Sequence, residues 1–172
     1  MHNKYYNDKG KEVPSVTNVI NIKNTPYLVK WANWQGFQHN NTDDILEETG
    51  FIGTFVHDLI DVHLTGREHE VSIHRPSNEK HYQIIRARFR RYLNWFYENS
   101  VKPIFTEREF VDNRYGGRID FYGLLNGVKT LIDFKTSSDI RYKHFLQLGA
   151  YVKLLEIDGY VIDQVGIVDF RE

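Results

Sequence analysis

The sequence predicts an α/β fold, in which one mixed four-stranded β-sheet is flanked by helices. The expected order is αβββαβ, with extra helices at the N-terminal end. Up to about residue 99, apolar residues recur at spacings of three and four, as in amphipathic helices. After Pro103 the spacing changes to two, as in strands with one buried face. The 172 residues suit a single domain, residues 1–172, with a helical part at about 14–99 and a sheet and helix part at about 104–170.

Two short helices are expected before residue 43. Ser15 or Thr17 caps the first, because a hydroxyl at that position accepts a hydrogen bond from a backbone N–H of the first turn. The second follows Pro26 and ends in a polar loop at 38–43. Its aromatic residues can pack in the core or stack on unpaired bases, and we expect core packing. These residues are Tyr27, Trp31, Trp34 and Phe37.

Two longer helices are predicted next, separated by an irregular segment at 67–77. The first runs from Asp43 to about Leu64 and stops at Gly66, and the second runs from about Asn78 to Asn99. The expected core stripe of the first is Phe51, Phe55, Leu59 and Val62, and that of the second is Tyr82, Ile85, Phe89, Tyr92, Leu93 and Phe96.

Three consecutive strands and a helix–strand pair follow. The three strands are separated only by short turns, so they form an antiparallel meander. The helix then crosses over to the last strand, which favours a parallel pair and makes the sheet mixed. The expected ranges are 104–111, 117–125 and 128–134 for the meander, 141–156 for the helix and 160–170 for the last strand.

Composition excludes several classes of protein. Lys and Arg number 22 against 23 Asp and Glu, so any nucleic-acid-binding surface has to be local. The chain contains no Cys, which excludes disulfides and a cysteine-ligated Fe–S cluster. The N-terminus is polar and lacks the apolar run of a signal peptide, so we expect a cytoplasmic protein with no membrane partner.

The residues that carry chemistry gather in the meander. Asp133 and Lys135 flank Phe134 on one strand, so both polar side chains should share a face while Phe134 enters the core. A short hairpin can bring Asp120 of the preceding strand next to Asp133. Adjacent carboxylates repel unless a cation neutralises them, and oxygen-rich sites suit Mg²⁺ or Mn²⁺. A lysine beside such a metal can align water or neutralise charge on a phosphate.

Four motifs in this order resemble those of the PD-(D/E)-x-K nuclease superfamily. They are Gly53-Thr54-x-x-His57, Gly117-x-x-Asp120, Asp133-x-Lys135 and Gln147-x-x-x-Tyr151. The resemblance is narrower to the RecB-like branch, which contains phage-type exonucleases and the mitochondrial genome maintenance exonuclease, and the segment Pro14-Ser15-Val16-Thr17 matches that branch as well. Ile119 stands where the superfamily name has Pro.

The resemblance implies a restriction-endonuclease-like core and a Mg²⁺- or Mn²⁺-dependent deoxyribonuclease. It implies metal ligation by His57, Asp120, Asp133 and the backbone carbonyl of Phe134, which requires the His57 ring to lie within roughly 8 Å of the carboxylates. It assigns Lys135 as the catalytic lysine and implies that Gln147 and Tyr151 orient this lysine and the DNA backbone. Glu107 matches the family's further strand carboxylate, with Glu109 as the alternative.

The expected partner is DNA that is single-stranded or has free ends. Arg86, Arg90 and Arg91 on the second long helix are the candidates for tracking phosphates, together with Thr136 beside Lys135, whereas a solvated helix face is the competing interpretation of the arginines. Asp58 and Asp61 are expected to be solvated helix residues. The family resemblance favours an exonuclease of phage or cellular DNA replication, recombination or repair, and a phage-encoded copy would act in the host cytoplasm. The alternatives are a structure-specific endonuclease of the same fold and a non-catalytic nucleic-acid-binding module.

Overall fold

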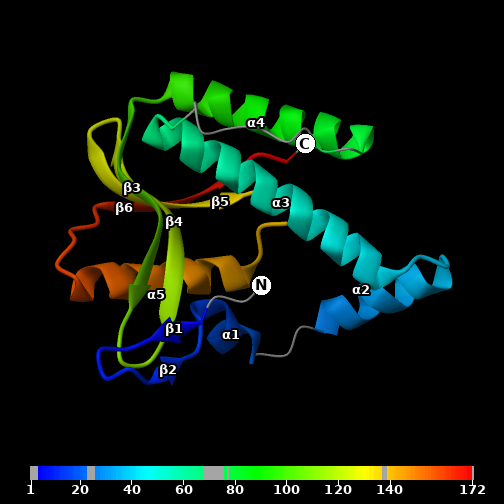
Figure 1. Ribbon diagram of the computed structural model, residues 1–172, viewed down its shortest axis with the longest axis horizontal. Coiled ribbons are helices and arrows are strands. Elements are labelled where there is room, and N and C mark those ends of the chain that lie inside the picture. Colours follow the sequence, from blue (N-terminus) through cyan, green and yellow to red (C-terminus); the bar gives the residue numbers. More distant parts are fainter. Residues whose placement is uncertain (1–3, 23–25, 68–75, 77, 137–138, 172) are drawn as a thin grey trace.

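The computed structural model describes residues 4–22, 26–67, 76, 78–136 and 139–171. The elements are β1 (Tyr5–Tyr6), β2 (Glu12–Val13), α1 (Val16–Asn21), α2 (Pro26–Phe37), α3 (Thr42–Thr65), α4 (Glu79–Glu98), β3 (Val101–Val111), β4 (Gly116–Leu125), β5 (Val128–Lys135), α5 (Tyr142–Ile157) and β6 (Gln164–Asp169). Figure 1 shows a sheet with α3 and α4 on one face and α5 on the other. Within the described part of the chain, no helix combines the length and apolar character that crossing a membrane requires.

The sheet confirms the predicted topology. Its strand order is β3-β4-β5-β6, with antiparallel pairs within the meander and a parallel pair between β5 and β6. The first strand begins at Val101, three residues earlier than expected, and the last strand is shorter than expected. Pro103 is compatible with this first strand because β3 lies at the edge of the sheet, where a missing N–H leaves no neighbour unpaired.

Polar caps set the helix boundaries close to those expected. Ser15, not Thr17, caps α1, and its hydroxyl accepts a hydrogen bond from the Asn18 N–H at 3.0 Å. Gly66 ends α3 in the left-handed conformation, with φ 68°, which a glycine adopts without strain. Most of the segment 67–77 that was expected to be irregular lies outside the described residues.

The most deeply buried residues of α3 lie one position after the predicted stripe. Its buried apolar side chains are those of Ile52, Val56, Ile60 and Leu64, whereas Phe51 is 46% exposed. The helix packs against both the sheet and α4, which itself contacts the sheet through Tyr92 and Trp95. The predicted Phe55 and Leu59 are partly buried against the same core. The predicted stripe of α4 is confirmed in Ile85 and Tyr92, which are buried in the same cluster.

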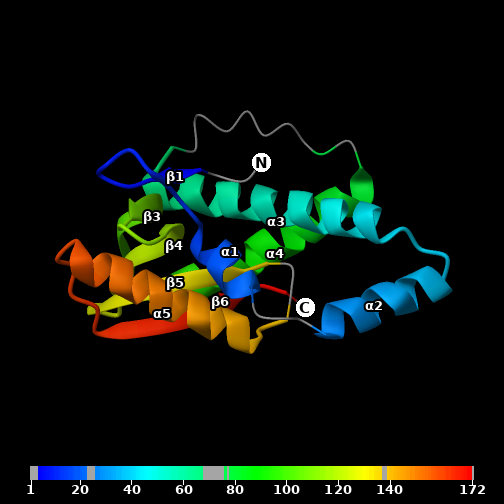
Figure 2. The ribbon, with the colours of Figure 1, turned by 90° about the horizontal axis from the view of Figure 1, so that it is seen from below.

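The aromatic face of α2 does not pack in the core, contrary to our expectation. Trp34 is 58% exposed and Phe37 is 79% exposed, whereas Trp31 is half-buried. Figures 1 and 2 show α2 extending away from the sheet. The side chain of Tyr27 lies outside the described residues.

An N-terminal hairpin and α5 both pack closely on the start of β4. The hairpin of β1 and β2 was not predicted, and its Tyr5 lies on Gly116, where a Cβ atom would come within 2.5 Å of the Tyr5 ring. A Cβ atom on Gly117 would likewise come within 2.5 Å of Tyr151 Cε1. The glycine pair therefore allows two tyrosine side chains to contact the strand that carries Asp120.

Candidate functional site

The two-residue alternation of the sheet breaks at facing positions on β3 and β4. Glu107 has φ 45°, in the left-handed region, and the side chains of both Thr106 and Glu107 bond to residues of α3. On β4, Ile119 packs in the core beneath α5, whereas Phe121 packs in the core beneath α3 and α4. Since Thr106 pairs with Phe121, Glu107 lies opposite Asp120. Both breaks therefore occur where the two strands present their carboxylates.

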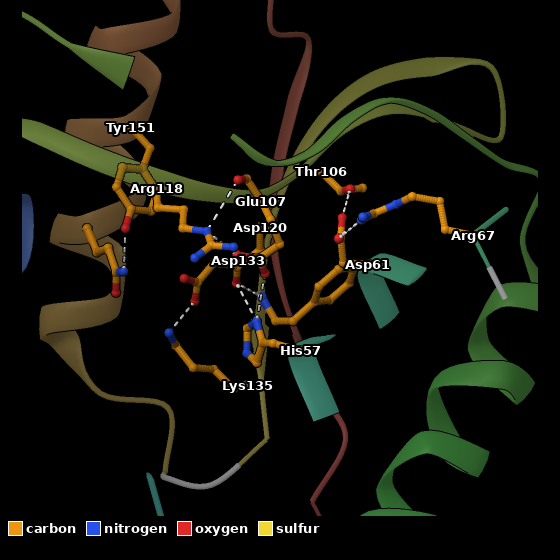
Figure 3. Close-up of polar contacts among 12 residues, drawn as sticks. His57, Asp61, Arg67, Thr106, Glu107, Arg118, Asp120, Asp133, Lys135 and Tyr151 are labelled. Carbon is orange, nitrogen blue, oxygen red and sulfur yellow. Dashed lines mark hydrogen bonds and ion pairs between the residues drawn. The ribbon is translucent and has the colours of Figure 1, made fainter. Parts of the chain in front are cut away.

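His57 of α3 meets these two carboxylates. Its Nδ1 atom lies 3.1 Å from Glu107 Oε1 and 3.9 Å from Asp120 Oδ2. One ligand atom from each of the three residues lies within 4.8 Å of the others, as Figure 3 illustrates. The fully buried Val56, next to His57 in α3, anchors the helix in the core. The distance condition for ligation by His57 is therefore met.

Asp133 and Lys135 share one face of β5, as predicted. Lys135 Nζ lies 2.7 Å from Asp133 Oδ2, and Phe134 between them is buried in the core on the other face. The Phe134 N–H donates to Asp120 Oδ2 at 2.8 Å and so ties the two strands together at the site. Apart from the ion pair with Lys135, Asp133 Oδ2 has no hydrogen-bond partner among the described residues.

These groups open into one pocket of about 340 Å³. His57, Asp120, Asp133 and Lys135 line it, so the helix and both inner strands contribute to the same space. Thr136 and Gln147 lie at its wall as well, and Phe134 together with Gly50, Gly53 and Thr54 of α3 completes the lining among the described residues. The Gly-Thr-x-x-His motif therefore borders the pocket along one side of α3.

The protonation of the site reflects crowded, buried carboxylates. Burial and then the nearby Asp120 carboxylate raise the pKa of Asp133 to about 7, against the opposing effect of Lys135. Burial and then Glu107 raise the pKa of Asp120, whereas His57 lowers it. Burial acts to lower the pKa of His57, but Asp120 and Glu107 outweigh it and raise this pKa to about 9. In the absence of a metal, protons compensate the negative charge of this site.

The donor set fits a divalent cation. Glu107, Asp120 and Asp133 offer carboxylate oxygens and His57 offers one imidazole nitrogen, a combination suited to Mn²⁺ and Mg²⁺. Among the described residues the buried Asp133 Oδ2 has no partner besides the Lys135 ion pair, and the raised pKa values of both aspartates indicate that negative charge is crowded here. A bound cation would neutralise this negative charge and give Asp133 Oδ2 a further partner. Asp133 itself lies outside the tight group formed by His57, Glu107 and Asp120.

Arg118 is a site residue that the sequence analysis did not assign. Its Nε atom lies 2.8 Å from Glu107 Oε2 and donates to the Glu107 carbonyl oxygen at 3.2 Å. The arginine thus holds the one residue of β3 whose backbone is left-handed. Glu109, the alternative carboxylate, is exposed, so Glu107 is the strand glutamate that reaches the site. The available signal was the place of Arg118 two residues before Asp120 on the same strand.

Asp61 is not a solvated helix residue, contrary to our expectation. Its carboxylate accepts a hydrogen bond from the Thr106 hydroxyl and pairs with Arg67, and only 17% of its side chain is exposed. It therefore attaches α3 to β3 one turn from His57, next to Glu107. Asp58 is exposed, as expected.

Gln147 and Tyr151 are hydrogen-bonded to each other. Gln147 Nε2 donates to the Tyr151 hydroxyl at 2.8 Å, and the tyrosine is buried. Burial raises the pKa of Tyr151 above its ordinary value, with Asp120 adding to the rise, so this hydroxyl stays neutral. Tyr151 thereby holds the Gln147 amide at the wall of the pocket.

The residues predicted to contact DNA divide into two groups. Thr136 is buried and lines the pocket. Arg86 and Arg90 are exposed on α4, and Arg91 donates to the Phe170 carbonyl oxygen at 3.3 Å, so none of these arginines lies at the pocket. Their contact with phosphates remains a prediction.

The chain was also compared with known proteins. No model of a known protein family matches it, and no curated protein matches it either. What the chain does has therefore to follow from the chemistry of the pocket.

Proposed function

We propose that the chain is a Mg²⁺- or Mn²⁺-dependent DNA nuclease with a restriction-endonuclease-like core. The observation that carries this proposal is the convergence of His57, Glu107 and Asp120 within 4.8 Å. His57 and Asp120 line a pocket that they share with the Asp133–Lys135 pair. Carboxylates that gather around one point with a lysine beside them suit the hydrolysis of a phosphodiester, whose reaction develops negative charge on the phosphoryl oxygens.

The residues of the site have different roles in this proposal. His57, Glu107, Asp120, Asp133 and the Phe134 carbonyl oxygen would hold the cation. When bound, a divalent cation polarises a phosphoryl oxygen and makes nearby water a stronger acid. Lys135 has three N–H donors, of which the Asp133 pair directs one, so the others are free to align water or to offset charge on the phosphate. Tyr151 acts through Gln147, which it fixes at the wall of the pocket.

An exonuclease is the favoured activity, with DNA that is single-stranded or has free ends as its substrate. This choice follows from the order of the four motifs along the chain, which resembles phage-type exonucleases. The test is to incubate end-labelled linear and circular single-stranded DNA with Mg²⁺, Mn²⁺ or EDTA. We expect the linear DNA to be degraded with either metal and to survive in EDTA, and the circle to survive throughout.

The other outcomes separate the alternatives. Cleavage of the circle, which has no ends, would identify an endonuclease. Binding of DNA without cleavage under any metal condition would identify a non-catalytic module. Cleavage that continues unchanged in EDTA would refute metal dependence.

Lys135→Ala separates chemistry from metal binding. The variant should bind Mn²⁺ by calorimetry nearly as well as the wild type, because the carboxylates and His57 remain, but should cut DNA about 10²-fold or more slowly. Lys129→Ala is the matched control, because Lys129 is an exposed lysine of the same strand. If Lys135→Ala loses metal affinity while Asp120→Ala retains it, the assigned roles are reversed.

A further inference from the structure

A second pocket of about 250 Å³ adjoins the acidic pocket. It lies between α1 and the first turns of α5, and Lys135 and Gln147 belong to the walls of both pockets. Its remaining lining among the described residues is Thr17, Ile20, Asn21, Lys143 and His144.

The polar groups of this second pocket are chemically opposite to those of the first. None of its described lining residues carries a carboxylate. Lys143 is half-buried and forms no ion pair with any described residue. The two ammonium groups, together with the Thr17 hydroxyl and the Asn21 amide, make the pocket rich in hydrogen-bond donors. Such a surface is complementary to an anion.

His144 adds a hydrogen-bond donor to the same wall. Only 4% of the residue is exposed, and its Nδ1 atom accepts a hydrogen bond from the Arg141 N–H at 3.1 Å. The proton of the neutral ring is therefore on Nε2, which has no acceptor among the described residues. Burial and then the surrounding cations, led by Lys135 and Lys143, lower the pKa of His144 to about 4.

We propose that this second pocket binds a phosphate group of the substrate strand, next to the phosphate that is cleaved. The inference rests on the proposed nuclease function. Lys135 lies between the two pockets and pairs with Asp133 on the acidic side. The bound group is either a terminal phosphate monoester or an internal phosphodiester, since both present the same anionic oxygens.

The first experiment uses inorganic phosphate as the probe and needs no catalysis. Calorimetric titration of the full chain in EDTA keeps metal out of the acidic pocket, so no bound cation attracts phosphate there. Lys143→Gln should weaken phosphate binding about tenfold, which corresponds to about 1.4 kcal/mol. Lys153→Gln should have no effect, because Lys153 is exposed on the same helix and pairs with Glu156. Wild-type protein that binds no phosphate, or variants that bind it equally, would overturn the proposal.

The second experiment identifies the source of the phosphate. Binding of one oligonucleotide is compared with a 5′-phosphate, a 3′-phosphate or neither, in Ca²⁺, with wild type and Lys143→Gln. A loss confined to one end-phosphorylated form assigns a terminal monoester, and an equal loss for all three assigns an internal phosphodiester. An unchanged affinity for all three contradicts the proposal.

The two proposals fail in different ways. Phosphate binding that depends on Lys143 in a protein that never cuts DNA would refute the nuclease and leave an anion pocket. Metal-dependent cleavage with phosphate binding that is indifferent to Lys143 would refute only the second pocket.

Discussion

His57 should make the metal-free protein less stable as the pH rises above neutrality. The pKa of His57 is raised from 6.5 to about 9, because Asp120 and Glu107 outweigh the effect of burial. The folded state therefore holds a proton that the unfolded state has released. This contribution is fully present below pH 6.5 and is lost as the pH rises through 9.

The magnitude follows from the shift. At about 1.4 kcal/mol per pKa unit, the raised pKa contributes about 3 kcal/mol to the free energy of unfolding. Asp133 acts in the same direction at lower pH, since its pKa is raised from 3.8 to about 7 and its effect is nearly complete above that value. Between pH 7.5 and 9.5 the contribution of Asp133 therefore changes little, and a comparison with a His57 variant reports on the histidine.

The assay is urea unfolding in EDTA across that interval, with His57→Gln as the comparison. The wild type should lose about 2 kcal/mol between pH 7.5 and 9.5, and the variant should lose much less. Adding Mn²⁺ should reverse the trend in the wild type, because the cation and the proton compete for the same imidazole. If the free energy of unfolding in EDTA falls equally steeply with pH in the two proteins, the inference that His57 is protonated next to the two carboxylates is refuted.

Three other predictions test separate parts of the structure. Gly117→Ala should lower the free energy of unfolding by about 1–3 kcal/mol, because the new Cβ atom would lie 2.5 Å from Tyr151. Gly149→Ala, on an open part of α5, should raise the free energy of unfolding by up to about 1 kcal/mol. Equal urea unfolding midpoints for the two variants would contradict this prediction. The wild-type His144, with its pKa lowered to about 4, stays neutral in the folded state while the unfolded chain takes up a proton, so the protein loses stability as the pH falls from 6.5 to 4.5. His144→Gln should reduce this loss of stability. A pH profile of thermal unfolding that is unchanged in the variant would contradict the prediction. Arg90→Ala should flatten the salt dependence of DNA binding by about one slope unit if this arginine contacts a phosphate, and an identical slope would return it to a solvated helix face.

The order of elements could be predicted because it depends on local patterns. The change from a period near 3.6 to a period of 2 after Pro103 marks the sheet, and the helical crossover before β6 fixes a parallel pair. The hairpin of Tyr5 and Val13 escaped prediction because strands of two residues are too short to show alternation. The exposure of Trp34 could not be predicted either, since an aromatic stripe does not reveal whether another element covers it.

The site was predictable where the alternation is regular. Asp133 and Lys135 meet because β5 keeps its two-residue period. The approach of Glu107 to His57 depends instead on a left-handed φ at a glutamate, a conformation that its residue type does not indicate. Asp61 appeared to be a solvated residue because its partner Thr106 is 45 positions away in the sequence.

The paired breaks in alternation also affect how the protein can evolve. Ile119 and Phe121 fill opposite cores, and Asp120 between them belongs to neither. Asp120→Asn would therefore leave no cavity, and its amide oxygen can still accept from the Phe134 N–H. Because burial raises the pKa of Asp120, the substitution would also remove an unfavourable charge from the metal-free protein. A lineage that no longer used the site could therefore lose it in one step without opening a cavity in either core.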